Sequence, residues 1–371
     1  KLYSHVWEQR KLGEVVQITM GQSPDGSTYS DEPSDYILVQ GNADLQNGWV
    51  CPRIWTTEVT KKADVGDLIM SVRAPAGSMG KTAYNAVIGR GVAAIKGNEF
   101  IYQLLVKMDT DGFWKTLSCG STFESLNSDN IKNAEIIIPS EEEQKQIGAF
   151  FCQLDNLITL HQRECTKLKN IKNITLTKMI KSIPDLKFSK FTNVWEQRKW
   201  SNTVDISTDM VDPKTGLYDE LPHVAPGNIE SFTGRLFDNV KLVKDENLIS
   251  GKFRFSAGDI IYGKINPQLG KYVFAAFSGL TSADAYVLNA KNGIDQKFLY
   301  AVLQTKDFFD YSVSVSKRSG MPKINRDELN AYSFAAPSTA EQAKIGSFLL
   351  SIDNLITLHQ RKLEKLKNIK N

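Results

Sequence analysis

"DNLITLHQR" spans residues 155–163 and recurs letter for letter at residues 353–361. Nine identical residues, 198 positions apart, do not arise by chance in a chain of 371 residues. An internal repeat must be recognised first, because a missed repeat leads to the wrong fold. The stretch indicates that a structural unit occurs twice. It also raises the question of whether His161 and His359 bind a ligand or only pack.

The repeat extends over most of the chain, and the offset between the copies drifts only from 186 to 198 residues. A unit of this length is too long for a solenoid repeat and has the size of a domain that folds alone. We therefore expect two duplicated domains that differ mainly in loop length. The matched segments are "VWEQRK" (6–11 and 194–199), "GNADLQNG" (41–48) with "GNIESFTG" (227–234), "GDLIMSVRAP" (66–75) with "GDIIYGKINP" (258–267), "EEQKQIGAFF" (142–151) with "AEQAKIGSFL" (340–349), and "KLKNIKN" (167–173 and 365–371).

Composition places the chain among soluble globular proteins, with 41% hydrophobic and 23% charged residues. The formal net charge of +3 permits a polyanionic partner without requiring one. No apolar run approaches the roughly 18–20 residues that a membrane span needs. The four cysteines show no CxxC spacing, and Leu363 stands in the second copy where Cys165 stands in the first. We therefore expect reduced cysteines and a cytoplasmic protein.

Each copy begins with about 135 residues of short, strand-like segments bounded by Gly, Pro, Asn or Asp. Segments with helical spacing lie between them, and no regular alternation of strand and helix is visible. This favours an α+β fold built from two tandem mixed α/β globules. The expected strands are 35–40, 67–72, 134–139, 259–264 and 272–277, and the expected helices between them are 99–108 and 297–305.

Each globule is followed by a long helix that starts after a proline, Pro139 or Pro337, with Ser140 or Ser338 at its cap. The first helix runs for some 40 residues, which corresponds to roughly 60 Å. Apolar positions in both helices repeat with 4, 3, 4, 3 spacing, which is typical of a coiled-coil seam. We expect the two helices to pair as an antiparallel coiled-coil spacer. The seam consists of Ile147, Phe151, Leu154, Ile158, His161, Cys165 and Leu168 in the first helix and of Ile345, Leu349, Ile352, Ile356, His359, Leu363 and Leu366 in the second.

These features predict four regions: a first globule at 1–140, a central helix and linker at 141–190, a second globule at 191–338 and a distal helix at 339–371. A seam position favours a role in register for His161 and His359, since polar residues there commonly specify register. A metal site is not expected, because the chain's four histidines offer no further ligands with matched spacing. Under a pseudo-twofold, the two histidines need not meet.

"PAGSMGKT" (75–82) resembles the end of a phosphate-binding loop. Such a loop needs a glycine five residues before its Gly-Lys-Thr, and Pro75 stands there without an amide hydrogen. The second copy keeps Gly270 and Lys271 but replaces Thr82 with Tyr272. The sequence also lacks a dinucleotide fingerprint, a base-holding Asn/Asp-Pro-Pro-aromatic motif and a repeated nucleophile–histidine pair. A non-catalytic chain is therefore expected, with no cofactor or metal of its own.

Basic, hydroxyl and amide side chains in the loops of both globules form a pattern suited to DNA. Such groups contact phosphates and base edges. Solvated turns explain any single residue equally well, but Lys81 matches Lys271, and Ser121 matches Ser319. Basic residues of the first helix, at 163–181, form either a solvated face or an interface for an acidic or nucleic-acid partner. The candidate DNA-binding residues are Gln22, Ser23, Arg73, Lys81, Ser121, Thr122, Lys264, Lys271, Lys317, Arg318 and Ser319.

The chain resembles the specificity subunit of type I restriction–modification systems. "PSEEEQKQIGAFFCQLDNLI" (139–158) and "PSTAEQAKIGSFLLSIDNLI" (337–356) resemble the start of that family's conserved regions. "WEQRKLGEV" (7–15) and "WEQRKW" (195–200) resemble the usual lead-in to its target-recognition domains. The second copy stops after "KLKNIKN", whereas the first continues through residues 174–193.

The resemblance implies that each globule reads one half of a bipartite, asymmetric DNA target and that the helices set the spacing. It implies as partners double-stranded DNA, two methyltransferase subunits, and motor–nuclease subunits, with S-adenosylmethionine, ATP and Mg²⁺ on those partners. Two alternatives remain open: a coiled-coil adaptor whose globules bind protein, and a nucleotide-hydrolysing enzyme that uses residues 75–82.

Overall fold

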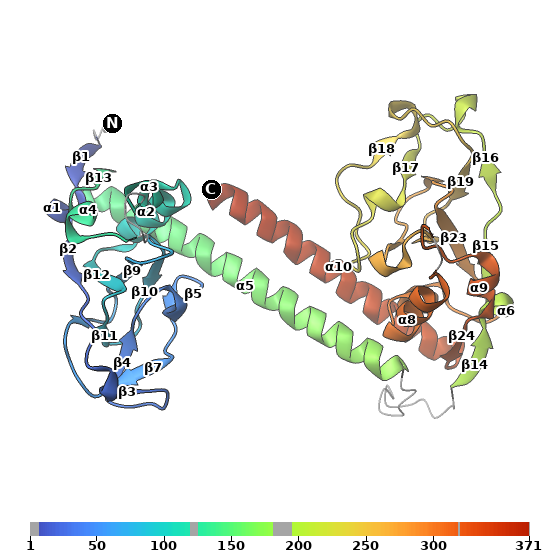
Figure 1. Cartoon of the computed structure of the whole chain (residues 1–371). Helices are drawn as coiled ribbons and strands as arrows, with labels where there is room; N and C mark the ends of the chain where they lie inside the picture. The colour runs from blue at the N-terminus through green and yellow to red at the C-terminus, as the bar shows by residue number, and fades with distance from the viewer. Residues whose placement is uncertain (1–6, 119–124, 181–194, 318–319, 371) are drawn as a thin grey trace. The chain divides into compact units, whose positions relative to one another are not determined.

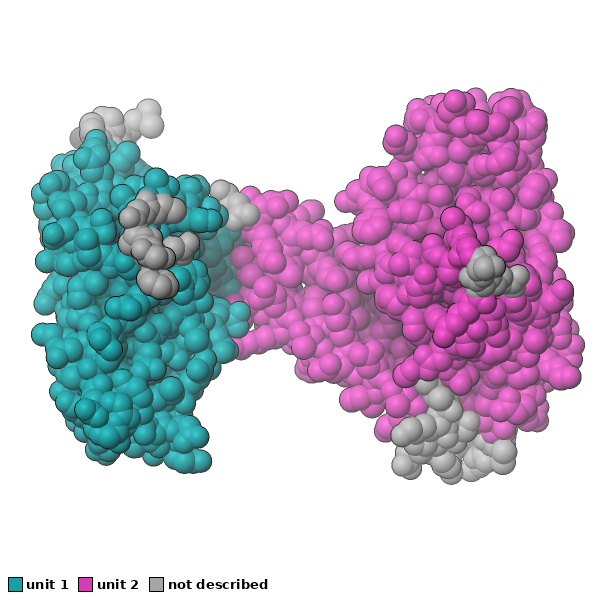
Figure 2. All heavy atoms as spheres, viewed as in Figure 1, with its two compact units in different colours: residues 1–157, 370 teal, residues 158–369, 371 magenta. Residues whose placement is uncertain are grey.

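The computed structural model describes residues 7–118, 125–180, 195–317 and 320–370 (Figure 1). Contacts divide the chain into two compact units, residues 1–157 with Lys370 and residues 158–369, which Figure 2 colours separately. The helix α5 (Glu141–Ile180) contributes to both units. The boundary between the units therefore lies within this helix and not at its start.

Unit 1 contains two sheets and a separate two-stranded ribbon. The sheet orders are β2-β12-β9-β10-β6-β5 and β3-β7-β4-β11-β8, and β1 pairs with β13. The strands are β1 (Glu8–Lys11), β2 (Gln17–Met20), β3 (Tyr29–Ser30), β4 (Tyr36–Val39), β5 (Leu45–Gln46), β6 (Trp49–Val50), β7 (Ile54–Thr56), β8 (Lys62–Ala63), β9 (Leu68–Ser71), β10 (Met79–Lys81), β11 (Ala86–Ile88), β12 (Val92–Lys96) and β13 (Glu135–Ile138); the helices before α5 are α1 (Leu12–Val15), α2 (Glu99–Thr110), α3 (Phe113–Ser118) and α4 (Ser128–Lys132).

Unit 2 repeats this plan. Its sheet orders are β15-β23-β20-β21 and β16-β19-β22-β17-β18, and β14 pairs with β24. The strands are β14 (Glu196–Lys199), β15 (Val204–Ile206), β16 (Met210–Val211), β17 (Pro222–Val224), β18 (Lys241–Leu242), β19 (Lys252–Phe255), β20 (Ile260–Gly263), β21 (Tyr272–Phe274), β22 (Gly279–Thr281), β23 (Ala285–Ala290) and β24 (Ser333–Ala336); the helices are α6 (Trp200–Thr203), α7 (Gln296–Leu303), α8 (Lys306–Val315), α9 (Arg326–Ala331) and α10 (Thr339–Lys370).

The duplication predicted from the sequence is confirmed at the level of strand order. The series β8-β11-β4-β7 of unit 1 corresponds to β19-β22-β17-β18 of unit 2, and the pair in the middle is parallel in both. The copies differ at the edges of this sheet. Unit 1 adds β3 beyond β7, whereas unit 2 adds β16 beyond β19. Divergence is therefore concentrated where a strand has only one neighbour.

The two repeated signatures meet at one junction in each unit. The "EQRK" strands β1 and β14 pair antiparallel with β13 and β24, the strands that precede the long helices. In unit 1, Trp7 Nε1 donates to Glu143 Oε1 at 3.3 Å. In unit 2, burial raises the pKa of Glu341, which a hydrogen bond from Trp195 partly offsets. A tryptophan and the glutamate of "EQ" thus tie the start of each unit to its long helix.

The glutamine of "EQ" explains why the long helices begin where they do. Gln144 Nε2 donates to Pro139 O at 3.0 Å and its Oε1 accepts from Asn98, the cap of α2. Gln342 makes the equivalent bonds, donating to Pro337 O at 2.8 Å and accepting from the backbone of Asp295 at 2.9 Å. Both glutamines are buried, so these bonds satisfy groups that would otherwise lose their water.

The glycine that follows in each long helix permits close contact with the globule. A Cβ at Gly148 would lie 2.9 Å from Phe100 N, and one at Gly346 would lie 2.5 Å from Phe298 N. Both distances are too short for any side chain. Gly148 and Gly346 are 198 residues apart, and so are the residues they contact, Phe100 and Phe298. The same offset therefore relates the contacts of the two long helices with their globules.

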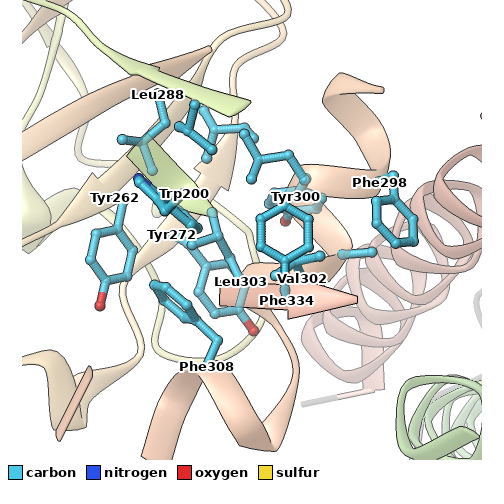
Figure 3. Packing of buried hydrophobic residues seen from close by; sticks show 14 of the residues in the cluster. Trp200, Tyr262, Tyr272, Leu288, Phe298, Tyr300, Val302, Leu303, Phe308 and Phe334 are labelled. Carbon is cyan, nitrogen blue, oxygen red and sulfur yellow. The ribbon is translucent and has the colours of Figure 1, made fainter. Parts of the chain in front are cut away.

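The largest core lies in unit 2 and is aromatic (Figure 3). Trp200 is fully buried and stacks on Phe308, with ring centroids 5.4 Å apart. Leu12 occupies the equivalent position in unit 1 and is also fully buried. The core of unit 1 is built instead around Trp114.

Candidate nucleic-acid interface and helix pair

Within unit 2, α10 runs antiparallel to the second half of α5 (Figure 1). His161 contacts His359, whereas Lys172, further along α5, contacts Asp353, further back along α10. The predicted seam residues are buried or half-buried in both helices, and these two contacts show that the helices run antiparallel. One part of the prediction needs correction. Ile147, Ile345 and Leu349 pack into the cores of their own units, because the first turns of each helix lie on the globule.

The two repeated histidines meet, contrary to the expectation that they need not. His161 Nδ1 and His359 Nδ1 are 2.8 Å apart, and the ring centroids are 5.0 Å apart. His161 and His359 are equivalent residues of the repeat. Because they contact each other, they lie on the pseudo-twofold axis that relates the two antiparallel helices. Burial lowers the pKa of His161, and the nearby His359 and Lys362 lower it further. One ring therefore donates a hydrogen bond while the other accepts it, which requires at least one neutral imidazole.

A buried ion pair lies further along the helices. Lys172 Nζ donates to Asp353 Oδ1 at 2.6 Å, and both side chains are about nine-tenths buried. Burial raises the pKa of Asp353, and Lys172 and Gln304 offset only part of that shift. Lys172 belongs to neither the solvated face nor the partner interface considered for residues 163–181, because it is buried against Asp353, a partner 181 residues away that local spacing does not reveal. Arg163, Lys167 and Lys169 of the same run are exposed as expected.

The predicted DNA-binding residues of the loops lie at several separate places. Gln22, Arg73 and Lys317 are exposed, and Ser23 Oγ accepts a hydrogen bond from Arg90 N at 3.1 Å. Four of the candidates lie outside the described residues: Ser121, Thr122, Arg318 and Ser319. Contact with DNA stays a prediction for all of them.

One local arrangement recurs at matched points of the two units. An isolated β-bridge joins Arg73 to Ser125 in unit 1 and Ile265 to Lys323 in unit 2. The bridge brings the loop after β9 or β20 together with the segment before α4 or α9. Arg73 and Ile265 are therefore equivalent residues held by the same backbone contact, and Lys264, beside Ile265, stands where unit 1 has the buried Val72.

A basic cluster in unit 2 surrounds this bridge. Lys264 Nζ lies 5.2 Å from the centre of the Tyr286 ring, and the guanidinium of Arg326 lies 5.6 Å from the same ring. Burial lowers the pKa of Lys264. The charges of Lys323 and Arg326 lower it further, whereas the carboxylate of Asp284 raises it. Arg326 also donates to the carbonyls of Ile206 and Ser207 at 2.8 Å each, so its guanidinium is partly engaged within unit 2. The positive charge of the cluster nevertheless favours a bound anion such as phosphate. Lys323 and Arg326 were not singled out from the sequence, because a single basic residue in a loop carries no distinctive spacing.

Lys81 and Lys271, predicted as phosphate contacts, have internal partners. Lys81 Nζ donates to Glu99 Oε2 at 3.0 Å and lies 4.5 Å from the centre of the Tyr102 ring. Lys271 donates to the carbonyl of Ile229. Both side chains therefore stabilise their own units, and a role in DNA binding would require them to leave these contacts.

Residues 75–82 do not form a phosphate-binding loop. They connect β9 to β10, which pair antiparallel, so a strand and not a helix follows the turn. Gly77 N donates to Ser71 O inside this hairpin, and the backbone is therefore occupied with its own strands. β20 and β21 form the matching hairpin in unit 2. This geometry removes the support for a nucleotide-hydrolysing enzyme.

A second stripe of apolar side chains lies on both helices beside the seam. Leu157, Leu160 and Ile171 of α5 are 43%, 52% and 37% exposed. Their counterparts 198 residues later in α10 are exposed in the same way: Leu355, Leu358 and Ile369. Large apolar side chains that recur on an exposed face typically mark a contact with another protein.

The described residues contain no group of three or more His, Cys, Asp or Glu side chains able to hold a metal ion. Cys51, Cys152 and Cys165 are free thiols, and Cys165 is buried in the seam as expected for an apolar filler. Among the described helices none is long and apolar enough to cross a membrane.

A tandem α+β domain, each copy of which is followed by a long helix, defines a class of proteins built by duplication. The family model described as "Type I restriction modification DNA specificity domain" matches residues 5–170 and 209–368, one match in each copy. The chain belongs to this family.

Individual relatives agree with the family assignment. The chain is 26% identical over 376 residues to the Escherichia coli EcoDI type I restriction enzyme specificity subunit, a match that covers 91% of this chain and 79% of the relative. It is 31% identical over 189 residues to the putative MjaX specificity subunit of Methanocaldococcus jannaschii, covering 47% of this chain and 44% of the relative. The fold is that of the crystal structure of a type I S subunit from M. genitalium, with a TM-score of 0.71 at 14% identity over 100% of this chain and 96% of that one.

Proposed function

We propose that this chain is the DNA-specificity subunit of a type I restriction–modification complex, in which each unit reads one half of a bipartite target. The observation that carries the proposal is the uneven divergence of the repeat. The helices are identical at residues 155–163 and 167–173 and their counterparts, whereas the globules share a strand order but differ at their edges. Two surfaces that read different half-sites must differ, and two surfaces that bind the same partner must not.

The basic cluster of Lys264, Lys323 and Arg326 supports DNA as the ligand. Lysine and arginine supply phosphate contacts that position a protein on the duplex, and side chains in the grooves supply sequence readout. Binding of duplex DNA should therefore fall steeply as salt rises. Salt-independent binding of a protein, without DNA, would favour the coiled-coil adaptor instead.

Mapping methylated adenines genome-wide, with and without this chain, tests the proposal. We expect a motif with two specified halves separated by an unread spacer, and we expect it to disappear when the chain is deleted. A contiguous motif, or a motif unaffected by deletion, would contradict the proposal.

We further propose that the helix pair sets the spacer length. α5 has 40 residues and is about 60 Å long, enough for half-sites about one helical turn, or 34–36 Å, apart. Seven residues inserted in both helices, opposite each other beside the His161–His359 pair, keep the seam in register. They add about 10 Å, or about three base pairs, to the spacer. The same insertion in α5 alone is the control, because it moves Lys172 away from Asp353.

The matched apolar stripes are proposed to dock two copies of a methyltransferase subunit. Leu160→Arg should remove one copy from the complex, Leu358→Arg the other, and the double variant both. Native mass spectrometry of the reconstituted complex counts the copies. In this proposal S-adenosylmethionine, ATP and Mg²⁺ are bound by methyltransferase and motor–nuclease subunits, this chain is non-catalytic, and the complex acts in the cytoplasm.

A further inference from the structure

Two adjoining cavities of about 260 and 350 Å³ lie within unit 2 between α5, α10 and the globule. Five residues line both cavities, so we treat them together as the unit 2 cavity. The volumes reach the lower end of the range for small-molecule sites, about 300–1,000 Å³. The shared residues are Asn173, Leu176, Phe232, Tyr272 and Gln304.

Hydrogen-bond acceptors without partners line this cavity. Asp353 is only 8% exposed, and Lys172 occupies its Oδ1. Its Oδ2 has no well-formed hydrogen bond within the described residues, although the side chain of Gln304, which donates to Tyr300 O, lies close enough to lower the pKa of the carboxyl. Gln304 Oε1 and Gln360 Oε1 are buried and equally unpartnered within the described chain. A buried acceptor left without a donor costs about 1–3 kcal/mol. The cavity therefore favours a ligand that brings hydrogen-bond donors.

Unit 1 shows how the equivalent position is filled when the protein supplies the donor. There Gln103 Nε2 donates to Asp155 Oδ2 at 2.7 Å. The contacts of Gly148 and Gly346 show that an offset of 198 relates these helices, so Ala301 stands in unit 2 where Gln103 stands in unit 1. Alanine has no amide, and the second oxygen of Asp353 is left for a ligand.

Phe232 adds an aromatic wall held in a strained backbone conformation. Its φ is 62°, a left-handed value that is unusual for a bulky residue and often marks a functional site. Its amide donates to Gly270 O and its carbonyl accepts from Tyr272 Oη, which hold the strain in place. The residue is 51% exposed although it lines both cavities, and its ring also contacts Phe309, with ring centroids 5.5 Å apart. It therefore presents a free aromatic surface.

The charges around the cavity narrow the ligand class. Lys169, Lys172 and Lys306 line it, whereas Asp353 is the single carboxylate among its lining residues. This excess of positive charge opposes a cationic ligand. The donor required by Asp353 must then belong to a neutral group, such as an amino substituent on an aromatic ring.

We propose that the unit 2 cavity binds an aromatic heterocycle that carries an amino group, of the nucleobase or nucleoside class. The amino group donates to Asp353 Oδ2, and the ring packs against Phe232. This site is separate from half-site reading and does not depend on the function proposed above. The same chemistry is available from a free nucleoside or from an unpaired base of a nucleic-acid strand.

Calorimetric titration of the full chain with adenosine tests the free source. We expect saturable binding with a Kd below about 1 mM. Purine riboside, which has a hydrogen in place of the amino group and no ring N–H, should bind at least tenfold more weakly. Phe232→Gly should abolish binding while the chain stays folded, because glycine accepts a φ of 62° without strain. Phe237→Ala, at another exposed phenylalanine of unit 2, should bind as the unchanged chain does.

A single strand that contains 2-aminopurine tests the other source, since stacking on Phe232 should quench its fluorescence. Quenching that is lost in Phe232→Gly, without binding of adenosine, would assign the site to a base within a strand. Equal binding of adenosine and purine riboside would overturn the role of Asp353. If neither probe shows binding that depends on Phe232, the cavity holds only water and the proposal is wrong.

Discussion

Units 1 and 2 hold the equivalent aspartates of the repeated "DNLITLHQR" segment in different ways. In unit 1, Asp155 accepts from Gln103 and Lys370, and its ion pair with Lys370 is about one-quarter exposed. In unit 2, Asp353 accepts from Lys172 in a pair that is about nine-tenths buried, and its second oxygen has no partner among the described residues. The same nine-residue segment thus makes different contacts in the two units, because the globule against which each helix packs has diverged.

The largest effect is expected where the ion pair is buried. Lys172→Met leaves the Asp353 carboxylate without its counter-ion and should lower the free energy of unfolding by about 3–5 kcal/mol. Chemical denaturation measures the loss. The double variant Lys172→Met with Asp353→Leu should recover most of it, since no buried charge remains. A double variant as unstable as the single one would show that packing, and not charge, explains the loss.

Unit 1 can be made to resemble unit 2 by removing its amide donor. Gln103→Ala leaves one oxygen of Asp155 without its donor, and we expect a loss of about 1–3 kcal/mol, because Gln103 is buried. The matched change Ala301→Gln in unit 2 should reduce adenosine binding by supplying the missing donor. If Gln103→Ala unfolds at the same denaturant concentration as the unchanged chain, water fully replaces the lost amide donor and the predicted loss is wrong.

The histidine pair makes stability depend on pH. Because the folded-state pKa of His161 lies below its ordinary value of about 6.5, the unfolded chain binds the proton more tightly. The contribution of the pair is present above about pH 6.5 and is lost as the pH falls below it. The slope of unfolding free energy between pH 7 and pH 5 should shrink in the double variant His161→Leu, His359→Leu. An unchanged slope would assign the pH dependence to other groups, such as His223.

The smallest expected effects separate internal from external lysines. Lys81→Ala removes a half-buried ion pair and should cost about 1 kcal/mol of stability with little change in DNA affinity. Lys323→Ala should leave stability unchanged, weaken DNA binding on all sequences and lower the salt slope by about one. If Lys81→Ala instead weakens DNA binding without loss of stability, the lysine leaves Glu99 to contact phosphate.

Much of the fold could be predicted because its signals are local or repeated. The strands at 67–72 and 259–264, the helices α2 and α7, and the seams of α5 and α10 follow from spacing within a few residues. The duplication followed from identity between the copies, and the strand orders confirm it.

The features that were missed depend on partners distant in sequence. Lys172 reads as a surface lysine until Asp353 lies opposite it, and the contact of His161 with His359 depends on the register of two helices. Lys81 has the spacing of a ligand-binding residue, yet its ammonium group donates to the carboxylate of Glu99. No pattern in the sequence distinguishes an exposed lysine from one that has such a partner.

Exchange of residues 1–140 for the first globule of another family member tests the central claim most directly, with methylated adenines mapped before and after. The account predicts that one half of the bipartite motif changes, while the other half and the spacer stay the same. A change in both halves, or in neither, would contradict the claim that each unit reads its own half-site.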